Sequence, residues 1–277
     1  MLKQRVITAL VLVAILFGAL AWSPLAFAVL MAAAFALAQA EWLQLAGWKF
    51  SNALGLALAL GTALVVGLVT QPEALHAVTF ALAELATGVW AGLGVVLLRS
   101  ERRGPVRIPS GLSTMFALLL PVAAWCSVIV FLREGIVLLI SVLFVVWLAD
   151  TAAYFAGRAF GKAKLAPHLS PGKTWAGVWG AVLAVGLLAL VAWKVFPTTP
   201  LYTSALLNRL GIAVALPLFA ALVALSIVGD LFESLLKRQA GVKDSGHLLP
   251  GHGGFYDRLD AMLALLPAAA LFWMWTT

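Results

Sequence analysis

The residues with the clearest chemical potential lie between Gly229 and Asp260, in the stretch GDLFESLLKRQAGVKDSGHLLPGHGGFYDRLD. Asp230 and Glu233 are three positions apart, and so are Asp257 and Asp260. On a helix this spacing places the two carboxylates of a pair on one face. If two such helices approach, the clustered carboxylates repel each other and need a cation to stay ionised. Oxygen ligands of this kind suit hard cations, Mg²⁺ above all.

Groups that bind phosphate surround these acids. His252, Gly253 and Gly254 lead into a predicted helix, whose first backbone N–H groups and dipole favour anions. Basic side chains of the same stretch add positive charge: Lys237, Arg238, Lys243 and Arg258. A second polar segment combines a hydroxyl, an ammonium and a helix start: Ser170, Lys173 and Thr174. A carboxylate-bound metal beside basic phosphate ligands is suited to phosphoryl or nucleotidyl transfer.

Two further aspartates admit two interpretations each. Asp244 is either a metal ligand or a partner that orients Lys243 or Arg238. Asp150, at the end of another apolar run, either lines the cavity expected at the site or holds the two polar segments together. Carboxylates in or near apolar helices are costly, so they are rare unless they have a function.

The composition requires a membrane protein. The 277 residues are 64% hydrophobic and 10% charged, whereas a soluble domain is about 45–50% apolar and about 25% charged. We therefore expect an all-α, polytopic integral membrane helical bundle with about nine transmembrane helices, forming a single transmembrane domain over residues 1–277. Strands are not expected, because backbone groups in hydrocarbon must be satisfied within helices or closed barrels. The expected spans are residues 5–22, 25–46, 52–70, 76–98, 112–131, 135–155, 174–196, 212–236 and 258–275.

The distribution of Lys and Arg predicts the orientation. If the N-terminus is cytoplasmic, all but three of the 18 basic residues fall on the cytoplasmic side, the exceptions being Arg133, Lys194 and Arg209. The positive-inside rule predicts this asymmetry. The polar loops 156–173 and 237–257 then face the cytoplasm, as does the active site. We further expect N-terminal spans over about 1–110 and a C-terminal catalytic part over about 112–277.

The position of the acids at a membrane face predicts that one substrate is a lipid. The alternative is an ion-coupled membrane transporter with an intramembrane carboxylate site. A transporter predicts internal repeats and carboxylates near the bilayer midplane. The sequence shows no clear repeat, and Asp230, Asp257 and Asp260 lie toward the cytoplasmic ends of their predicted spans.

The same stretch resembles a known family. Its matching positions are Ser234, Leu236, Lys237, Arg238, Lys243, Asp244, Gly246, Leu249, Pro250, His252, Gly253, Gly254, Phe255, Asp257, Arg258, Leu259 and Asp260. This pattern resembles the signature of the phosphatidate cytidylyltransferases (CDP-diacylglycerol synthases). Residues 150–175 resemble the family's upstream cytoplasmic motif, and Glu41-Trp42 with Gln44-Leu45 shows a weaker resemblance. One departure is Ala176, where the family commonly has Glu or Gln; if that side chain binds substrate, its contact is missing here.

The resemblance implies that the cytidylyl group of CTP is transferred to phosphatidate, giving CDP-diacylglycerol and pyrophosphate for phospholipid synthesis. It implies Mg²⁺ on Asp230, Asp257 and Asp260, with K⁺ as a second cation. The catalytic residues would be Asp230, Lys243, Asp244, Asp257 and Asp260. The substrate-binding residues would be Ser170, Lys173, Thr174, Lys237, Arg238, His252, Gly253, Gly254 and Arg258. The expected partners are CTP, phosphatidate and membrane lipids, and no nucleic acid, with a homodimer as one option for the assembly. The expected location is a bacterial inner membrane.

Overall fold

The computed structural model describes residues 2–104 and 106–277, without the side chains of residues 2–5, 72, 102 and 103. Four basic side chains assigned above to the cytoplasmic side, those of Lys3, Arg5, Arg102 and Arg103, therefore lie outside the description. The first five helices are α1 (Leu2–Trp22), α2 (Pro24–Leu45), α3 (Phe50–Thr70), α4 (Pro72–Arg103) and α5 (Ser110–Glu134). They are followed by α6 (Ile136–Phe160), β1 (Lys164–Ala166), β2 (Ser170–Thr174), α7 (Trp175–Val195), α8 (Tyr202–Leu210), α9 (Ile212–Ala240) and α10 (Tyr256–Thr276).

The all-α membrane architecture is confirmed. Each expected span lies on a helix, and eight helices of the described chain are long and apolar enough to cross a membrane: α2 to α7, α9 and α10. In α1, the apolar stretch with described side chains is Val6–Trp22, which is shorter than those of the other eight. Ser23 separates α1 from α2, because Pro24 begins α2 and the Ser23 hydroxyl accepts a hydrogen bond from the N–H of Ala26 at 3.0 Å.

Two elements were not expected from the sequence. The expectation that strands are absent is wrong for residues 164–174, where β1 and β2 form an antiparallel hairpin with Lys164 opposite Thr174. This hairpin lies in the polar segment between α6 and α7, where the constraint that hydrocarbon places on the backbone does not apply. The short helix α8 occupies most of the segment 197–211, which lies between two of the expected spans.

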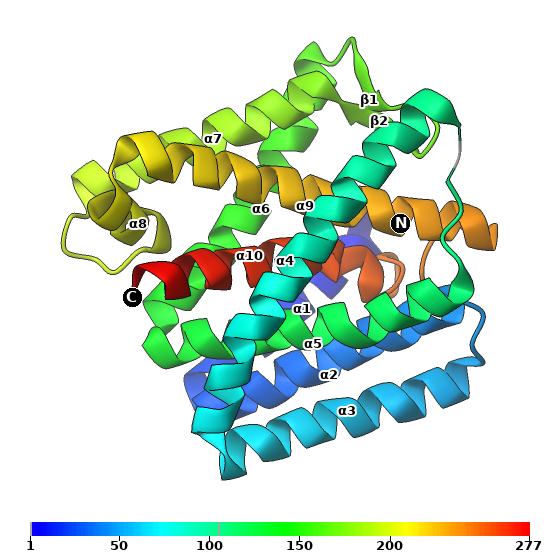
Figure 1. Ribbon diagram of the computed structural model, residues 1–277, viewed down its shortest axis with the longest axis horizontal. Coiled ribbons are helices and arrows are strands. Elements are labelled where there is room, and N and C mark those ends of the chain that lie inside the picture. Colours follow the sequence, from blue (N-terminus) through cyan, green and yellow to red (C-terminus); the bar gives the residue numbers. More distant parts are fainter. Residues whose placement is uncertain (1, 105) are drawn as a thin grey trace.

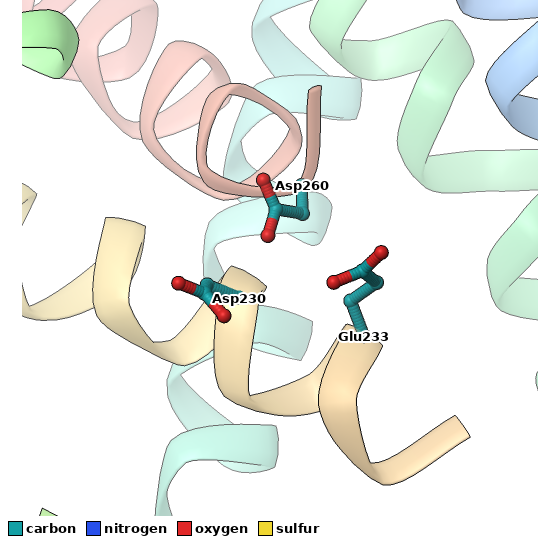
Figure 2. A group of neighbouring side chains, drawn as sticks. All are labelled: Asp230, Glu233 and Asp260. Atoms are coloured by element: carbon teal, nitrogen blue, oxygen red, sulfur yellow. The ribbon is translucent and has the colours of Figure 1, made fainter. Parts of the chain in front are cut away.

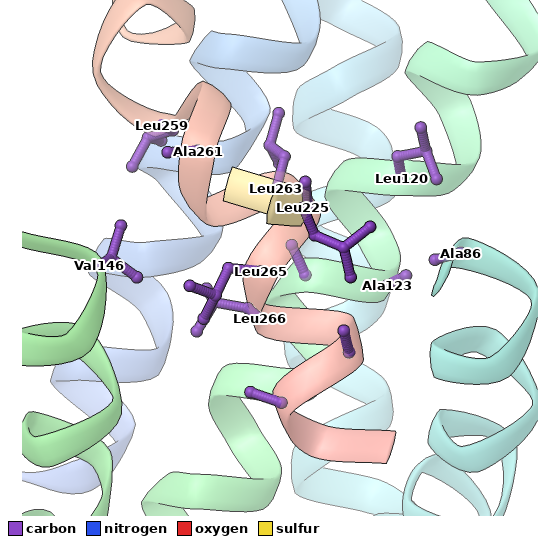
Figure 3. Packing of buried hydrophobic residues seen from close by; sticks show 14 of the residues in the cluster. Ala86, Leu120, Ala123, Val146, Leu225, Leu259, Ala261, Leu263, Leu265 and Leu266 are labelled. Atoms are coloured by element: carbon purple, nitrogen blue, oxygen red, sulfur yellow. The ribbon is translucent and has the colours of Figure 1, made fainter. Parts of the chain in front are cut away.

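Helix α10 forms the centre of the bundle. It packs against α4, α5 and α9 and lies between α9 and α5 in Figure 1. In the most apolar 18-residue stretch of α10, 83% of the residues are buried inside the protein, compared with 11% in that of α3. Helix α3 therefore offers most of its surface to lipid. Figure 3 shows Leu263, Leu265 and Leu266 of α10 among side chains from four neighbouring helices, which include Ala86, Leu120, Ala123, Val146 and Leu225.

Side chains satisfy the backbone groups that helix prolines release. Pro267 has no N–H, so the carbonyl of Leu263 loses its partner within α10. The indole N–H of the buried Trp90 donates to that carbonyl at 2.9 Å. In α5, the Gln39 amide likewise donates to the carbonyl of Ala117, four residues before a helix proline, at 2.9 Å. Such pairing is required because an unsatisfied carbonyl in a membrane interior costs several kcal/mol, on the order of 2–7.

The polar segments meet at one end of the bundle. In Figure 1 the connections α2–α3 and α9–α10 and the β1–β2 hairpin all lie on the right, whereas the α3–α4 connection and α8 lie on the left. The arrangement agrees with the alternation of loops expected from the distribution of basic residues. The helix ends that carry the acidic residues belong to the right-hand end.

Candidate active site

A glycine allows α9 and α10 to approach closely beside the acidic residues. A Cβ atom added at Gly229 would overlap the carbonyl oxygen of Asp260 and lie 3.1 Å from the Cβ of Ala264. Only a residue without a side chain therefore fits between the two helices at this level. The next residue, Asp230, is consequently placed against Asp260 across the helix interface.

Three carboxylates converge at this interface. Asp230, Glu233 and Asp260 each contribute one oxygen, and these oxygens all lie within 4.8 Å of one another. Figure 2 shows the three side chains directed into the space between α9 and α10. Glu233 and Asp260 are only 2% and 9% exposed, so water screens their mutual repulsion poorly. One oxygen of Glu233, Oε1, is buried without a hydrogen-bond partner among the described residues.

Two lysines neutralise part of this charge. The Nζ of Lys173, from β2, lies 2.8 Å from a carboxylate oxygen of Asp230. The Nζ of Lys237 lies 2.8 Å from Glu233 and 2.7 Å from Asp257. The cluster therefore contains more carboxyl groups than ammonium groups, four against two.

Asp257 lies beside the trio and has its own set of partners. Its Oδ2 accepts hydrogen bonds from the N–H of Gly254 at 2.8 Å and of Ser245 at 2.9 Å. The Ser245 hydroxyl also lies 2.9 Å from this oxygen, while Oδ1 contacts Lys237. The carboxylate trio thus contains Glu233 in place of the predicted Asp257. A metal-binding role for Asp257 stays a prediction, and Oδ1 retains a lone pair for it.

Two cavities meet at the acidic cluster. The larger has a volume of about 780 Å³, within the range of about 300–1,000 Å³ that small-molecule sites occupy. The smaller has a volume of about 330 Å³. Both are lined by the same five residues, which are Ser170, Asp230, Asp257, Arg258 and Asp260. Two ligands that occupied the two cavities would therefore touch beside Asp230 and Asp260.

The remaining predicted residues divide between the cavities. Asp150, Lys173 and Thr174 line the larger cavity. The smaller cavity is lined by four predicted residues of the α9–α10 region, namely Lys237, Arg238, Lys243 and Asp244. The Thr174 hydroxyl also caps α7, because it accepts a hydrogen bond from the N–H of Gly177 at 3.2 Å. A substrate contact of Thr174 would have to share this hydroxyl.

The start of α10 is less open to an anion than the sequence suggested. The N–H of Gly254 donates to the Asp257 carboxylate, and the N–H of Asp257 donates to the Ser245 hydroxyl. The N–H of Tyr256 donates to Glu41. The Arg258 guanidinium donates two hydrogen bonds to the carbonyl of His252, at 2.7 and 3.0 Å. The substrate contacts predicted for His252, Gly253, Gly254 and Arg258 stay predictions, and a phosphate would have to displace some of these internal partners.

Several residues of the site were not predicted from the sequence. The larger cavity is also lined by Tyr154, Arg158 and Lys164. Arg158 and Lys164 belong to the segment 150–175, which was matched to a family motif, but neither residue was given a role in the site. Glu233 was expected in the carboxylate cluster but not among the metal ligands, although it follows Asp230 by one helical turn. Helical spacing alone does not show that the Asp257 side chain points away from the trio, toward Lys237 and Ser245.

The fold and the site define a class: a polytopic membrane enzyme with carboxylates and basic groups clustered at one end of its helices. Comparison with known proteins specifies the family. The model of the cytidylyltransferase family matches residues 3–275. The chain is 40% identical over 286 residues to the phosphatidate cytidylyltransferase of Pseudomonas aeruginosa, covering 99% of this chain and 97% of the relative. It is 36% identical over 293 residues to the protein of that name from Haemophilus influenzae, covering 99% of each.

The chain therefore belongs to the cytidylyltransferase family, as the signature around Asp257 and Asp260 led us to expect. It is an integral membrane nucleotidyltransferase. The alternative of an ion-coupled transporter finds no support in these comparisons.

Proposed function

We propose that this protein transfers the cytidylyl group of CTP to phosphatidate, the reaction implied by the names of its relatives. An oxygen of the phosphatidate phosphate forms a bond to the α-phosphorus of CTP. The bond from the α-phosphorus to the oxygen that bridges to the β-phosphate breaks, and pyrophosphate leaves. Because the attacking oxygen is already anionic, the reaction needs no strong general base. Its barrier comes mainly from the approach of two polyanions and the charge on the leaving group.

The acidic trio fits a divalent cation. Three oxygen donors converge within 4.8 Å, and the buried Oε1 of Glu233 has no hydrogen-bond partner among the described residues. Carboxylate oxygens are the ligands that Mg²⁺ prefers. We assign Mg²⁺ to Asp230 and Asp260, with Glu233 or Asp257 as a further ligand. The ion would supply positive charge against the triphosphate.

The basic side chains bind and orient the substrates in this proposal. Lys173 faces Asp230 at the boundary of the two cavities, where it can exchange this carboxylate for a substrate phosphate. Lys237, Arg238 and Lys243 line the smaller cavity and neutralise phosphate charge there. Asp244, beside Lys243, orients these basic groups or binds the cation.

One observation carries the proposal: Asp230 and Asp260 lie between two cavities that both open onto basic side chains. Nucleotidyl transfer needs two anionic substrates to meet at one cationic centre, and this arrangement provides such a meeting point. A cavity at the end of the helices also suits a lipid whose headgroup is polar and whose chains stay in the bilayer.

The proposal extends to the setting of the enzyme. We assign the protein to the bacterial inner membrane with its N-terminus and active site in the cytoplasm, because Lys and Arg concentrate on that side. Residues of about 1–110 would form an N-terminal unit and residues of about 112–277 the catalytic part. K⁺ as a second cation and a homodimeric assembly complete the proposal.

The test is an assay of the purified protein in detergent with radiolabelled CTP, phosphatidate and Mg²⁺. We expect pyrophosphate release that requires the lipid, together with labelled CDP-diacylglycerol. Release without lipid, or no release at all, would contradict the proposed reaction. The ligand role of Asp257 is tested separately with Asp257→Ala, and wild-type activity in that variant would exclude it.

A further inference from the structure

A buried carboxylate from the N-terminal half lies under the α9–α10 loop. Glu41, in the last turn of α2, is fully buried. Its Oε2 accepts a hydrogen bond from the N–H of Tyr256 at 2.9 Å. The Ser245 hydroxyl lies 2.9 Å from the same oxygen. One carboxylate oxygen therefore binds both ends of the segment 245–256, at Ser245 and at Tyr256.

The local backbone is shaped around this carboxylate. A Cβ atom added at Gly246 or at Gly254 would overlap the carboxylate oxygens of Glu41. Both glycines thus allow the loop backbone to lie directly against the charged group. The neighbouring Trp42 stacks on the ring of Tyr256, with centroids 4.9 Å apart and an angle of 11° between the planes. Two consecutive residues of α2 accordingly fix the start of α10.

The contacts continue from Glu41 to the acidic cluster. The Ser245 hydroxyl is 2.9 Å from Oε2 of Glu41 and 2.9 Å from Oδ2 of Asp257, so its single proton serves one carboxylate at a time. Asp257 then contacts Lys237, which contacts Glu233. The orientation of Asp257 consequently depends on Ser245, and that of Ser245 depends on Glu41.

Glu41 does not line either active-site cavity among the described residues. A buried carboxylate is costly unless hydrogen bonds compensate for its lost hydration. The hydrogen bonds of Oε2 go to Ser245, in the loop that carries Lys243 and Asp244, and to Tyr256 at the start of α10. Oε1 is buried without a hydrogen-bond partner among the described residues. These observations fit a group that shapes the site without touching the substrates.

We infer that Glu41 is a positioning residue of the active site, which fixes the conformation of the α9–α10 loop and, through Ser245, the orientation of Asp257. The inference rests on the proposed function for its activity readout alone. The loop conformation has a second readout that needs no turnover, because Lys243 is an exposed trypsin site within the loop.

The experiment uses the full-length protein in detergent with lipid and compares Glu41→Ala, Glu41→Gln, Glu41→Asp and the wild type. The measured quantity is the rate of tryptic cleavage after Lys243, identified from fragment masses. Cleavage follows the population of the open loop. In Glu41→Ala we expect cleavage at least about tenfold faster, the size of effect that follows from losing a hydrogen bond to a charged group. We expect pyrophosphate release to fall by a similar factor.

Glu41→Gln and Glu41→Asp test separately whether the charge or the length of the side chain matters. Glu41→Gln keeps an acceptor oxygen at the same distance from the loop, so its cleavage and activity should stay within about threefold of the wild type. Glu41→Asp keeps the charge but withdraws the oxygens by one methylene, so it should behave like Glu41→Ala. This pair also decides the question if Glu41→Ala does not fold. The matched control is Glu84→Ala, which removes an exposed carboxylate from α4 and should leave both quantities unchanged.

A double-mutant cycle distinguishes a specific contact between Glu41 and the loop from a general loss of stability. Gly246→Ala should accelerate cleavage because its methyl group overlaps the Glu41 carboxylate. In the Glu41→Ala background the same methyl group meets open space, so its effect should be smaller. Additive effects would overturn the inference.

The outcomes distinguish this inference from the proposed function. Wild-type cleavage in both Glu41→Asp and Glu41→Ala would overturn the positioning role, whatever their activity. If cleavage followed the expected order while the wild type released no pyrophosphate, the positioning role would stand and the proposed reaction would fail.

Discussion

Replacing Gly229 by alanine should separate the two helices that carry the acidic trio. The added methyl group would overlap the carbonyl oxygen of Asp260 and lie 3.1 Å from the Cβ of Ala264. Unstrained carbon contacts begin at about 3.5–4.0 Å. The helices must therefore move apart by about 0.5 Å at Ala264 and by more at the Asp260 carbonyl. Neither obstacle can swing aside, since one is backbone and the other is the Cβ of an alanine.

The geometry gives the expected size of the effect. A displacement of about 1 Å between reacting groups can lower a rate by about 100-fold. Overpacking of a buried interface also costs about 1–3 kcal/mol of stability. We therefore expect Gly229→Ala to reduce kcat by about 10- to 100-fold and to lower the thermal unfolding midpoint. Binding of divalent cation should weaken in parallel, because Asp230 and Asp260 lie on the two separated helices.

The assay is lipid-dependent pyrophosphate release at saturating CTP, with the unfolding midpoint recorded on the same preparations. Gly55→Ala is the matched control: it lies in α3, where an added Cβ has no neighbour within 4 Å among the described residues. Alanine at that position should leave the rate unchanged and stabilise α3 by about 0.5–1 kcal/mol. Wild-type kcat in Gly229→Ala would refute the argument that close helix approach assembles the site.

Three further predictions address the cation and the packing of α10. Asp260→Asn should lower kcat by about 100-fold or more, whereas the exposed Glu73→Gln should not; comparable rates would remove Asp260 from the mechanism. Chelation with EDTA should abolish pyrophosphate release and added Mg²⁺ should restore it, and turnover that persists in EDTA would contradict a divalent cation. Trp90→Phe should destabilise the protein by about 1–3 kcal/mol, because the Leu263 carbonyl loses its donor. Adding Pro267→Ala should recover part of that loss by restoring a backbone N–H; no recovery in thermal melts would contradict this pairing.

The sequence was sufficient to predict the helices and their order. Long apolar runs leave the backbone no alternative to helix in a membrane, so each expected span lies on a helix. The hairpin of β1 and β2 was missed because that argument applies to hydrocarbon alone, and the segment 164–174 is polar. The two acidic pairs were also evident, because spacing of three residues along a helix is a local property.

The sequence could not show which carboxylates face each other. The helices are apolar on most of their surface, so periodicity does not indicate which side of α9 or α10 packs inward. The tertiary structure combines Glu233 with Asp230 and Asp260 and directs Asp257 toward Lys237 and Ser245.

What the sequence determined by itself was therefore local: the membrane class, the positions of the helices, the polar segments and the two pairs of acidic residues. Tertiary structure alone decided the contacts between distant segments. Glu41 is 204 residues away from Ser245, and no spacing rule relates them. They meet because Gly246 and Gly254 let the loop backbone lie against a carboxylate that burial has deprived of water. Such contacts depend on how whole helices pack, which the order of residues along any one helix does not express.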